Sequence, residues 1–200
     1  MRDEIARRLV HFSGTAVPAA YLLEVLPWRV IRWVLAVGAV GAVVLEAVRL
    51  LVGLDWYVFE KLTREYERNN PAGYALAVIA MAVVAWAFAP TVAVPALLML
   101  TVADPFAGLM ADAGGPESTK EWWVVGATFL LCLGIGLPFL PPRAAVPAAL
   151  VATLADATTP RVASYVIDDN FSIPVGAAIT AFLAATYVPV ILCESACRIA

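Results

Sequence analysis

An aspartate stands inside a long apolar stretch of the chain, where a charged group is costly. The segment TVADPFAGLMADAGG, residues 101–115, places Asp104 directly before a proline and opens into Gly114 and Gly115, with Lys120 beyond them. Magnesium at phosphate sites takes one or two carboxylates together with substrate phosphates, and glycine-rich turns expose backbone N–H groups to an anion. The pattern therefore indicates a site for a metal ion and phosphate groups. The plainer alternative is a capped helix end followed by a loop lysine.

A second acidic pattern lies further along the chain. Asp168, Asp169 and Asn170 come shortly before Pro174, at the start of an apolar segment. Acids and asparagine are common at a helix start, where they cap free N–H groups. The same residues would also complete a metal or nucleotide site, with the carboxylates holding a cation and the asparagine hydrogen-bonding. The residues alone leave both interpretations open.

Basic groups also stand where they could reach a phosphate. Arg7 and His11 are four residues apart and share a helix face, and membrane insertion does not require a histidine. A basic cluster at a membrane edge also serves as an orientation signal and a contact for lipid headgroups. Glu46 and Arg49 either neutralise each other within a helix, or Glu46 orients Arg49 toward a phosphate. Arg64 lies in an amphipathic stretch and is a further candidate to meet a nucleotide.

The elements that must position these groups are strongly apolar. Hydrophobic residues make up 62% and charged residues 14% of the 200 positions, and the mean hydropathy is +0.86. Soluble domains are about 45–50% apolar and about 25% charged, so the composition indicates a polytopic membrane protein. No soluble body follows the first apolar segment, as one would after a secretory signal. A net charge of −3 gives no reason to expect a nucleic-acid partner, and a single histidine does not suit a structural zinc site.

Seven segments have the length and character of membrane helices, since a spanning helix needs about 20 mostly apolar residues. They are residues 8–26, 30–54, 72–90, 92–111, 122–140, 143–160 and 173–196. No linker or polar domain separates them, so the sequence predicts one all-α domain over residues 1–200, a bundle of about seven transmembrane helices. The excess of arginine over lysine, the abundant alanine and a pI near 5.1 suggest a salt-loving archaeon.

The basic residues near the helix ends predict the orientation of the bundle, because cytoplasmic loops carry an excess of lysine and arginine. With the N-terminus in the cytoplasm, eight of them lie inside and four outside: Arg2, Arg7, Arg8, Lys61, Arg64, Arg68, Lys120 and Arg161 against Arg29, Arg32, Arg143 and Arg198. The same topology brings His11, Glu46, Asp104, Asp156 and Asp168 to the inner side, although only lysine and arginine define it. We therefore expect one site on the cytoplasmic face of a prokaryotic plasma membrane.

Taken in order, these stretches resemble the family of CTP-dependent lipid kinases, which includes dolichol kinase, phytol kinase and the yeast-type diacylglycerol kinase. The similarity extends from about residue 4 to residue 177. It rests on Arg7-Arg8 with His11, Glu46-x-x-Arg49, Asp104-x-x-Ala107, a glycine-rich loop with Lys120, and Asp168-Asp169-Asn170 before Ile173-Pro174. The chain departs from the family pattern at Ala103, where the family has glycine, and after Lys120, where two tryptophans replace the usual residues. Asp156 stands in the helix where the family has a glutamate.

The resemblance implies that the γ-phosphate of CTP is transferred to the hydroxyl of a long isoprenoid or glycerolipid alcohol from the bilayer, with Mg²⁺ as cofactor. It implies that Asp104 and either Asp168 or Asp169 hold the metal. On this resemblance we expect basic residues, glycines and an asparagine to contact the nucleotide: Arg49, Arg64, Lys120, Gly114, Gly115 and Asn170. We expect either Asp104 or His11 to be the general base, and three residues to support the site: Arg7, Glu46 and Asp156.

Other functions remain alternatives at this stage. A cytidylyltransferase acting on a lipid phosphate needs the same metal and triphosphate groups, but it releases pyrophosphate instead of CDP. A small transporter needs polar groups across the middle of the membrane, whereas this chain collects them at one side. A purely structural subunit would need neither Asp104 nor His11. The sequence leaves the oligomeric state open.

Overall fold

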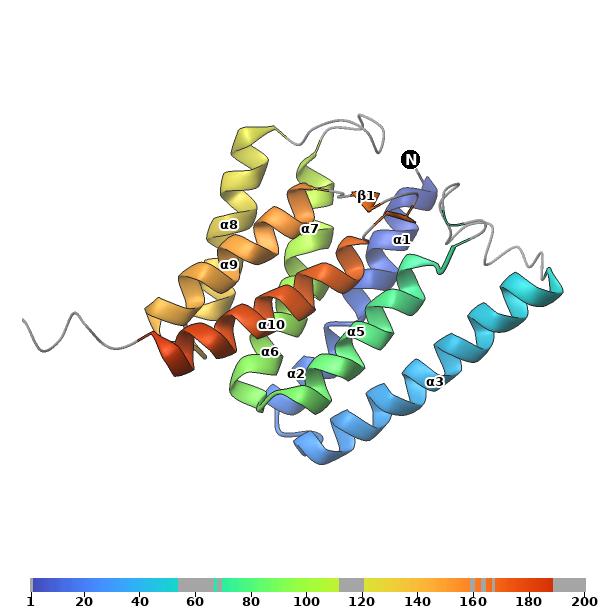
Figure 1. The fold of residues 1–200 in the computed structure, drawn as a ribbon, viewed down its shortest axis with the longest axis horizontal. Coiled ribbons are helices and arrows are strands. Elements are labelled where there is room, and N and C mark those ends of the chain that lie inside the picture. Colours follow the sequence, from blue (N-terminus) through green and yellow to red (C-terminus); the bar gives the residue numbers. More distant parts are fainter. Residues whose placement is uncertain are drawn as a thin grey trace, which may run out of the picture.

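The structure is a computed structural model that describes residues 2–53, 67, 70–111, 121–158, 161–162, 165–166 and 168–188, with side chains from Arg8 onward except in the two strands. Its elements, in chain order (Figure 1), are α1 (Arg2–Ser13), α2 (Ala16–Leu22), α3 (Trp28–Val52), α5 (Gly73–Ala87), α6 (Pro90–Leu98), the π-helix η2 (Met99–Ala103), α7 (Asp104–Met110), α8 (Trp122–Gly136), α9 (Pro142–Ala157), β1 (Arg161–Val162), β2 (Tyr165–Val166) and α10 (Asp169–Tyr187).

Each of the seven predicted segments corresponds to a helical segment of the described chain. Helices α1 and α2 together form the first, and α6, η2 and α7 form one continuous helix, Pro90–Met110. The prediction of an all-helical chain is therefore confirmed for the described residues, apart from one short hairpin. In that hairpin β1 pairs antiparallel with β2, with Arg161 opposite Val166.

The first segment differs from the single helix predicted over residues 8–26, because a turn at Gly14 separates α1 from α2. A Cβ at Gly14 would lie 3.0 Å from the carbonyl oxygen of His11 and 3.1 Å from Cγ2 of Thr101. Glycine therefore allows the turn to pack tightly against η2. The amphipathic α1 and the short α2 replace one long membrane helix.

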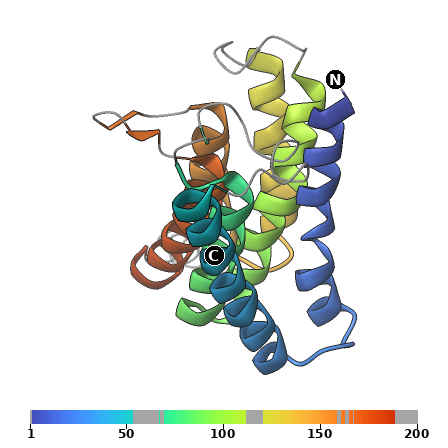
Figure 2. The same cartoon turned by 90° about the vertical axis from the view of Figure 1, so that its right-hand side faces the viewer.

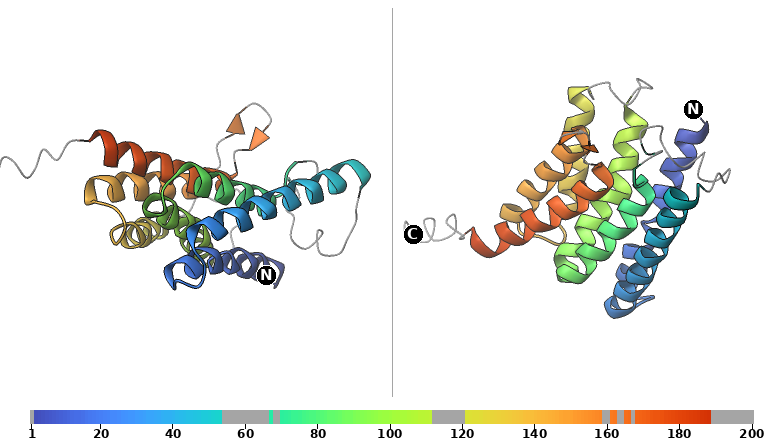
Figure 3. Two further views of the ribbon diagram at one scale, coloured as in Figure 1. Left: turned by 90° about the horizontal axis from the view of Figure 1, so that it is seen from below. Right: turned by 45° about the vertical axis from the view of Figure 1, so that its right-hand side comes forward.

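Helix α10 has the most extensive packing in the bundle. It packs along α9 and against α5 and α6 (Figures 1 and 3). The buried positions there are rich in alanine, such as Ala148, Ala152, Ala178 and Ala181. Small side chains allow helix backbones to approach closely, which is how helices associate within lipid. Helix α3 packs on α5 at the edge of the bundle, and much of its apolar surface is exposed.

Three of the described helices are long and apolar enough to cross a membrane: Trp28–Val52, Pro90–Met110 and Asp169–Tyr187. Helices α5 and α8 are also apolar but shorter. The hydroxyl groups of Thr101, Thr128 and Thr153 donate to the backbone carbonyl oxygens four residues earlier, so they do not depend on water. The described part of the chain is thus compatible with a membrane protein.

The two ends of the bundle differ in character. The starts of α1 and α8 and the ends of α7 and α9 lie at the upper side in Figures 1 and 2. At the lower side, where α3 starts and α5 ends, the rings of Trp33 and Trp86 meet edge to face, with centroids 5.1 Å apart. Arg32 lies over the Trp86 ring, 4.2 Å from its centroid. The acidic groups described next belong to the upper half of the bundle.

Candidate metal centre

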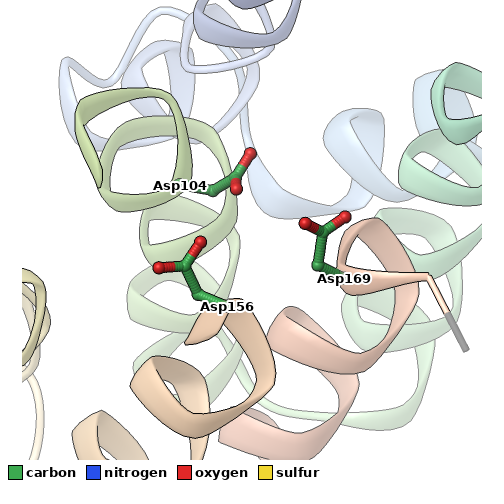
Figure 4. Close-up of side chains that lie close together, drawn as sticks. All are labelled: Asp104, Asp156 and Asp169. Carbon is green, nitrogen blue, oxygen red and sulfur yellow. The ribbon is translucent and has the colours of Figure 1, made fainter. Parts of the chain in front are cut away.

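Three aspartates from three helices bring their carboxylates together (Figure 4). Asp104 is the first residue of α7, Asp156 lies in the last turn of α9, and Asp169 is the first residue of α10. One carboxylate oxygen of each residue lies within 4.8 Å of the other two. Asp156 is buried, with 5% of its surface exposed, and the other two are half-buried. Residues far apart in the sequence therefore form one carboxylate cluster.

The spacing of these oxygens suits one divalent cation. Mg²⁺ binds oxygen at about 2.1 Å, so opposite ligands lie about 4.2 Å apart, and the longer bonds of Ca²⁺ allow about 5 Å. An upper limit of 4.8 Å between the oxygens needs only small side-chain rotations to fit Mg²⁺. Two carboxylates 4.8 Å apart repel each other by about 3.5 kcal/mol at an effective dielectric constant of about 20. A cation held between the three would offset that repulsion.

A wide helical turn directly before Asp104 sets the position of its side chain. Within η2, the backbone N–H of Asp104 donates to the carbonyl oxygen of Met99, five residues earlier. Pro105 explains the widening, because its ring would collide with the carbonyl group of Thr101 in a regular α-helix. The hydroxyl of Thr15 donates to that carbonyl oxygen instead, at 3.3 Å. Single π-helical turns inside α-helices often occur at functional sites.

Helix α1 runs antiparallel to the helix that carries Asp104, and three contacts define how they meet. Gly14 touches η2 at the first contact. At the second, Nε2 of His11 lies 3.8 Å from Oδ2 of Asp104. At the third, a Cβ on Gly108 would lie 3.0 Å from Cζ of Arg8, so the guanidinium group rests on the backbone of α7. Helix α1 thus adds a histidine and an arginine over the face of α7 that carries Asp104.

The resemblance offers either Asp168 or Asp169 as a metal ligand, and the structure places Asp168 beside the carboxylate cluster and not in it. Its Oδ1 accepts hydrogen bonds from the backbone N–H of Asn170 at 3.0 Å and from the side-chain amide at 2.7 Å. Asp168 thereby caps α10, which begins at Asp169, earlier than the predicted segment at 173. Burial, together with the neighbouring charge of Asp169, raises the pKa of Asp168 to about 6. The position in the cluster belongs to Asp169.

Asn170, a predicted nucleotide contact, is buried between the starts of α5 and α10. Its Nδ2 also donates to Oδ1 of Asp169 at 3.3 Å. Its Oδ1 is buried and has no hydrogen-bond partner among the described residues. A Cβ on Gly73 would lie 2.7 Å from Nδ2 of Asn170. The glycine at the start of α5 therefore admits the amide that holds Asp168 and Asp169.

The predicted pair of Glu46 and Arg49 ties the end of α3 to the start of α5. Arg49 donates to both carboxylate oxygens of Glu46, at 3.0 and 2.7 Å, and to the carbonyl oxygen of Asn70 at 2.6 Å. Glu46 also accepts from the Tyr74 hydroxyl at 2.6 Å and from the backbone N–H of Ala72 at 3.0 Å. These contacts favour the interpretation of a neutral structural pair. Nucleotide binding by Arg49 stays a prediction.

Several predicted site residues lie outside the described part of the chain. They are Arg64, Gly114, Gly115 and Lys120. The backbone of Arg7 belongs to α1, but its side chain is not described. The predictions for these five residues therefore stand as predictions.

Some features of the site are not predicted by the sequence. Asp156 is predicted only to support the site, whereas its carboxylate is a buried member of the cluster. The contacts of Arg8 with α7 and of Tyr74 with Glu46 are not predicted. One available signal was Gly108, four residues after Asp104, because a small residue at helical spacing permits another element to approach.

No family model matches the chain, and no curated protein or solved structure matches it. The residues of the site and the resemblance of their pattern are therefore the observations that bear on function.

Proposed function

We propose that this protein is an integral membrane enzyme that transfers a phosphoryl group from CTP to the hydroxyl of a long-chain lipid alcohol. The observation that carries the proposal is the cluster of Asp104, Asp156 and Asp169 with His11 beside it. Phosphoryl transfer needs cations on the phosphate oxygens and a group that orients the attacking hydroxyl. The resemblance of the motif order to CTP-dependent lipid kinases supports the choice of donor and acceptor.

In this proposal the bundle spans a prokaryotic plasma membrane, with the site at the cytoplasmic face. Three helices of spanning length support membrane insertion. Tryptophans begin α8 at one end and flank the start of α3 and the end of α5 at the other, as in the aromatic belts of membrane proteins. The excess of basic residues on the N-terminal side supports the orientation. A lipid alcohol reaches such a site with its tail still in the bilayer.

Each member of the site then has a defined task. Asp104, Asp156 and Asp169 would hold Mg²⁺, and the ion would supply positive charge next to the phosphate oxygens. A carboxylate bound to a cation is a weak proton acceptor, so we assign the general base to His11, whose Nε2 lies 3.8 Å from Asp104. His11 takes the hydroxyl proton as the alcohol oxygen bonds to the γ-phosphorus. The bond from that phosphorus to the bridging oxygen breaks, and CDP leaves.

The nucleotide contacts in the proposal come mainly from the resemblance. Arg64 and Lys120 neutralise the phosphates, and the backbone N–H groups of Gly114 and Gly115 bind them. The buried Oδ1 of Asn170 is consistent with a role for that residue, because a buried polar atom normally has a hydrogen-bond partner, which can be water, an ion or a ligand.

The decisive assay uses purified protein in lipid nanodiscs with Mg²⁺ and a panel of polyprenols, phytol and diacylglycerol. CTP, ATP, GTP or UTP carries a label on its γ-phosphate. The proposal expects a labelled lipid monophosphate with CTP as the best donor and CDP as the second product. Pyrophosphate release with CMP attached to a lipid phosphate would identify a cytidylyltransferase instead. Folded protein that labels no lipid and releases no pyrophosphate would reject both activities.

Asp104→Asn tests the assignment of the site. Loss of a key electrostatic group costs about two orders of magnitude in rate or more, so kcat should fall at least about 100-fold. Glu24→Gln is the matched control, because it removes an exposed carboxylate that follows α2 at the other side of the bundle. It should retain the wild-type rate. Wild-type activity in Asp104→Asn would contradict the assignment.

A further inference from the structure

The face of α1 that meets α7 carries a second basic group besides His11. Arg8 and His11 are three residues apart, so they share one face of that helix. Gly108 and Asp104 are four apart and share one face of α7. Because His11 meets Asp104 and Arg8 meets Gly108, the arginine lies one helical turn from the aspartate, over the same face of α7.

Gly108 leaves room for this arginine and for little else. A Cβ there would lie 3.0 Å from Cζ, 3.1 Å from Nε and 3.2 Å from Nη2 of Arg8, tighter than ordinary van der Waals contact. A Cβ on Gly126 or Gly134 would meet no atom within 4 Å, whereas Gly73 and Gly176 are also tightly packed. Among the described glycines, Gly108 is the one whose close neighbour is an arginine, and it lies next to the carboxylate cluster.

We propose that Arg8 binds the terminal phosphate of the nucleoside triphosphate, on the α1 side of the carboxylate cluster. This inference rests on the proposed function and names the group that holds the transferred phosphate. A guanidinium group keeps its charge and presents a planar fork of N–H donors that matches two phosphate oxygens. Carboxylates alone repel a triphosphate, so a fixed cation beside them is needed to complete an anion site.

The competing explanation is that Arg8 only balances the negative charge of Asp104, Asp156 and Asp169. The two explanations differ in which ligand senses the arginine. A residue that binds the terminal phosphate affects CTP and leaves CDP alone, because CDP lacks that group. A residue that only balances charge affects both nucleotides alike, or neither.

The experiment measures the dissociation constants of CTP and CDP by calorimetry in nanodiscs with Mg²⁺ and without lipid alcohol. A hydrogen bond to a charged group is worth roughly a 10- to 100-fold change in affinity. Arg8→Gln should weaken the binding of CTP by about that factor and the binding of CDP by less than about twofold. Arg8→Lys keeps the charge but loses the fork, so it should lie between the wild type and Arg8→Gln.

A double-mutant cycle tests the seat formed by Gly108. Gly108→Leu should weaken CTP binding in the wild-type background. It should have no further effect in the Arg8→Gln background, because the arginine that it displaces is already absent. Gly108→Ala, whose added methyl group shifts the guanidinium only slightly, should have a smaller effect. Gly126→Leu adds the same side chain where there is open space, and it should leave both affinities unchanged.

Several results would overturn the inference. It fails if Arg8→Gln weakens CTP and CDP equally, if it weakens neither, or if Gly108→Leu and Arg8→Gln add independently. Mn²⁺ binding and the unfolding temperature report whether each variant is folded. If Arg8→Gln does not fold, the CTP and CDP affinities of the two single variants Arg8→Lys and Gly108→Ala test the inference in its place. A wild-type protein that binds no nucleotide refutes the proposed function and this inference together. Wild-type binding with an unchanged Arg8→Gln refutes this inference alone.

Discussion

Replacing Asp156 by asparagine should stabilise the protein without divalent cations and destabilise it, relative to the wild type, when they are present. Asp156 is the buried member of the carboxylate cluster, and asparagine keeps its shape while removing its charge. Two charge pairs at up to 4.8 Å, each worth about 3.5 kcal/mol, are removed. Proton sharing and the partial exposure of the other two carboxylates reduce this gain, so we expect about 2 kcal/mol without a cation.

Bound metal should make the wild type more stable than Asp156→Asn. A cation at about 100 times its dissociation constant stabilises the folded state by about 2.7 kcal/mol. The variant lacks one of the three metal ligands, so it should lose most of this stabilisation by the cation. For a chain of this size 1 kcal/mol corresponds to about 2–4 °C in unfolding temperature. The variant should therefore melt about 4–8 °C above the wild type in EDTA, and it should show little rise on addition of Mg²⁺ or Mn²⁺.

The assay is intrinsic tryptophan fluorescence during heating in nanodiscs, with EDTA and with a titration of Mg²⁺ or Mn²⁺. Glu24→Gln, which lacks an exposed carboxylate far from the cluster, should follow the wild type in both conditions. Lower stability of Asp156→Asn than of the wild type in EDTA, with an equal response of both proteins to the metal, would contradict this prediction. That result would mean that groups of the protein itself compensate the charge of Asp156.

Two further predictions concern the contacts that position α10 and α5. Gly73→Ala should lower both the unfolding temperature and the Mn²⁺ affinity, because its Cβ would lie 2.7 Å from Nδ2 of Asn170, which donates a hydrogen bond to Asp169. The control is Gly41→Ala, where a Cβ meets no atom within 4 Å, and it should be neutral or stabilising by up to about 1 kcal/mol. Equal behaviour of the two variants would contradict the link between Gly73 and the carboxylate cluster. Tyr74→Phe removes the 2.6 Å hydrogen bond to Glu46 and should lower the free energy of unfolding, measured in denaturant, by about 2 kcal/mol. The Mn²⁺ affinity should not change. A loss of Mn²⁺ affinity would show that the contacts of Glu46 affect the carboxylate cluster.

The helical segments could be predicted because lipid-compatible helices are long and apolar, and that property is local to each segment. The division of roles between Asp168 and Asp169 could not. Adjacent acids look alike in a sequence, and only the start of α10 decides which one caps the helix and which one joins the cluster. The role of Asp156 could not be predicted for the same reason, since it depends on the packing of α9 against η2 and α10.

The contact of Arg8 next to the carboxylate cluster could not be predicted from the sequence either. Arg7 lies four residues from His11 and Arg8 lies three, and both spacings put a residue on the same side of a helix. The contact with Gly108 distinguishes Arg8, and it depends on how deeply α1 packs against α7. Glu46 and Arg49 were paired correctly from their spacing, but their additional partners at the start of α5 come from a separate part of the chain.

The π-helical turn before Asp104 also separates two requirements on one helix. It inserts one extra residue, which rotates everything after it by about 100° relative to a regular helix. The part of the helix before the turn can therefore be selected for packing, with Ala93 and Leu97 buried in the core. The half after it can be selected for chemistry. Deleting one residue at Val102 would keep the hydrophobic length of the segment almost unchanged, yet it would turn Asp104 away from its two partners, so the phase of this helix is as much a part of the site as the aspartate.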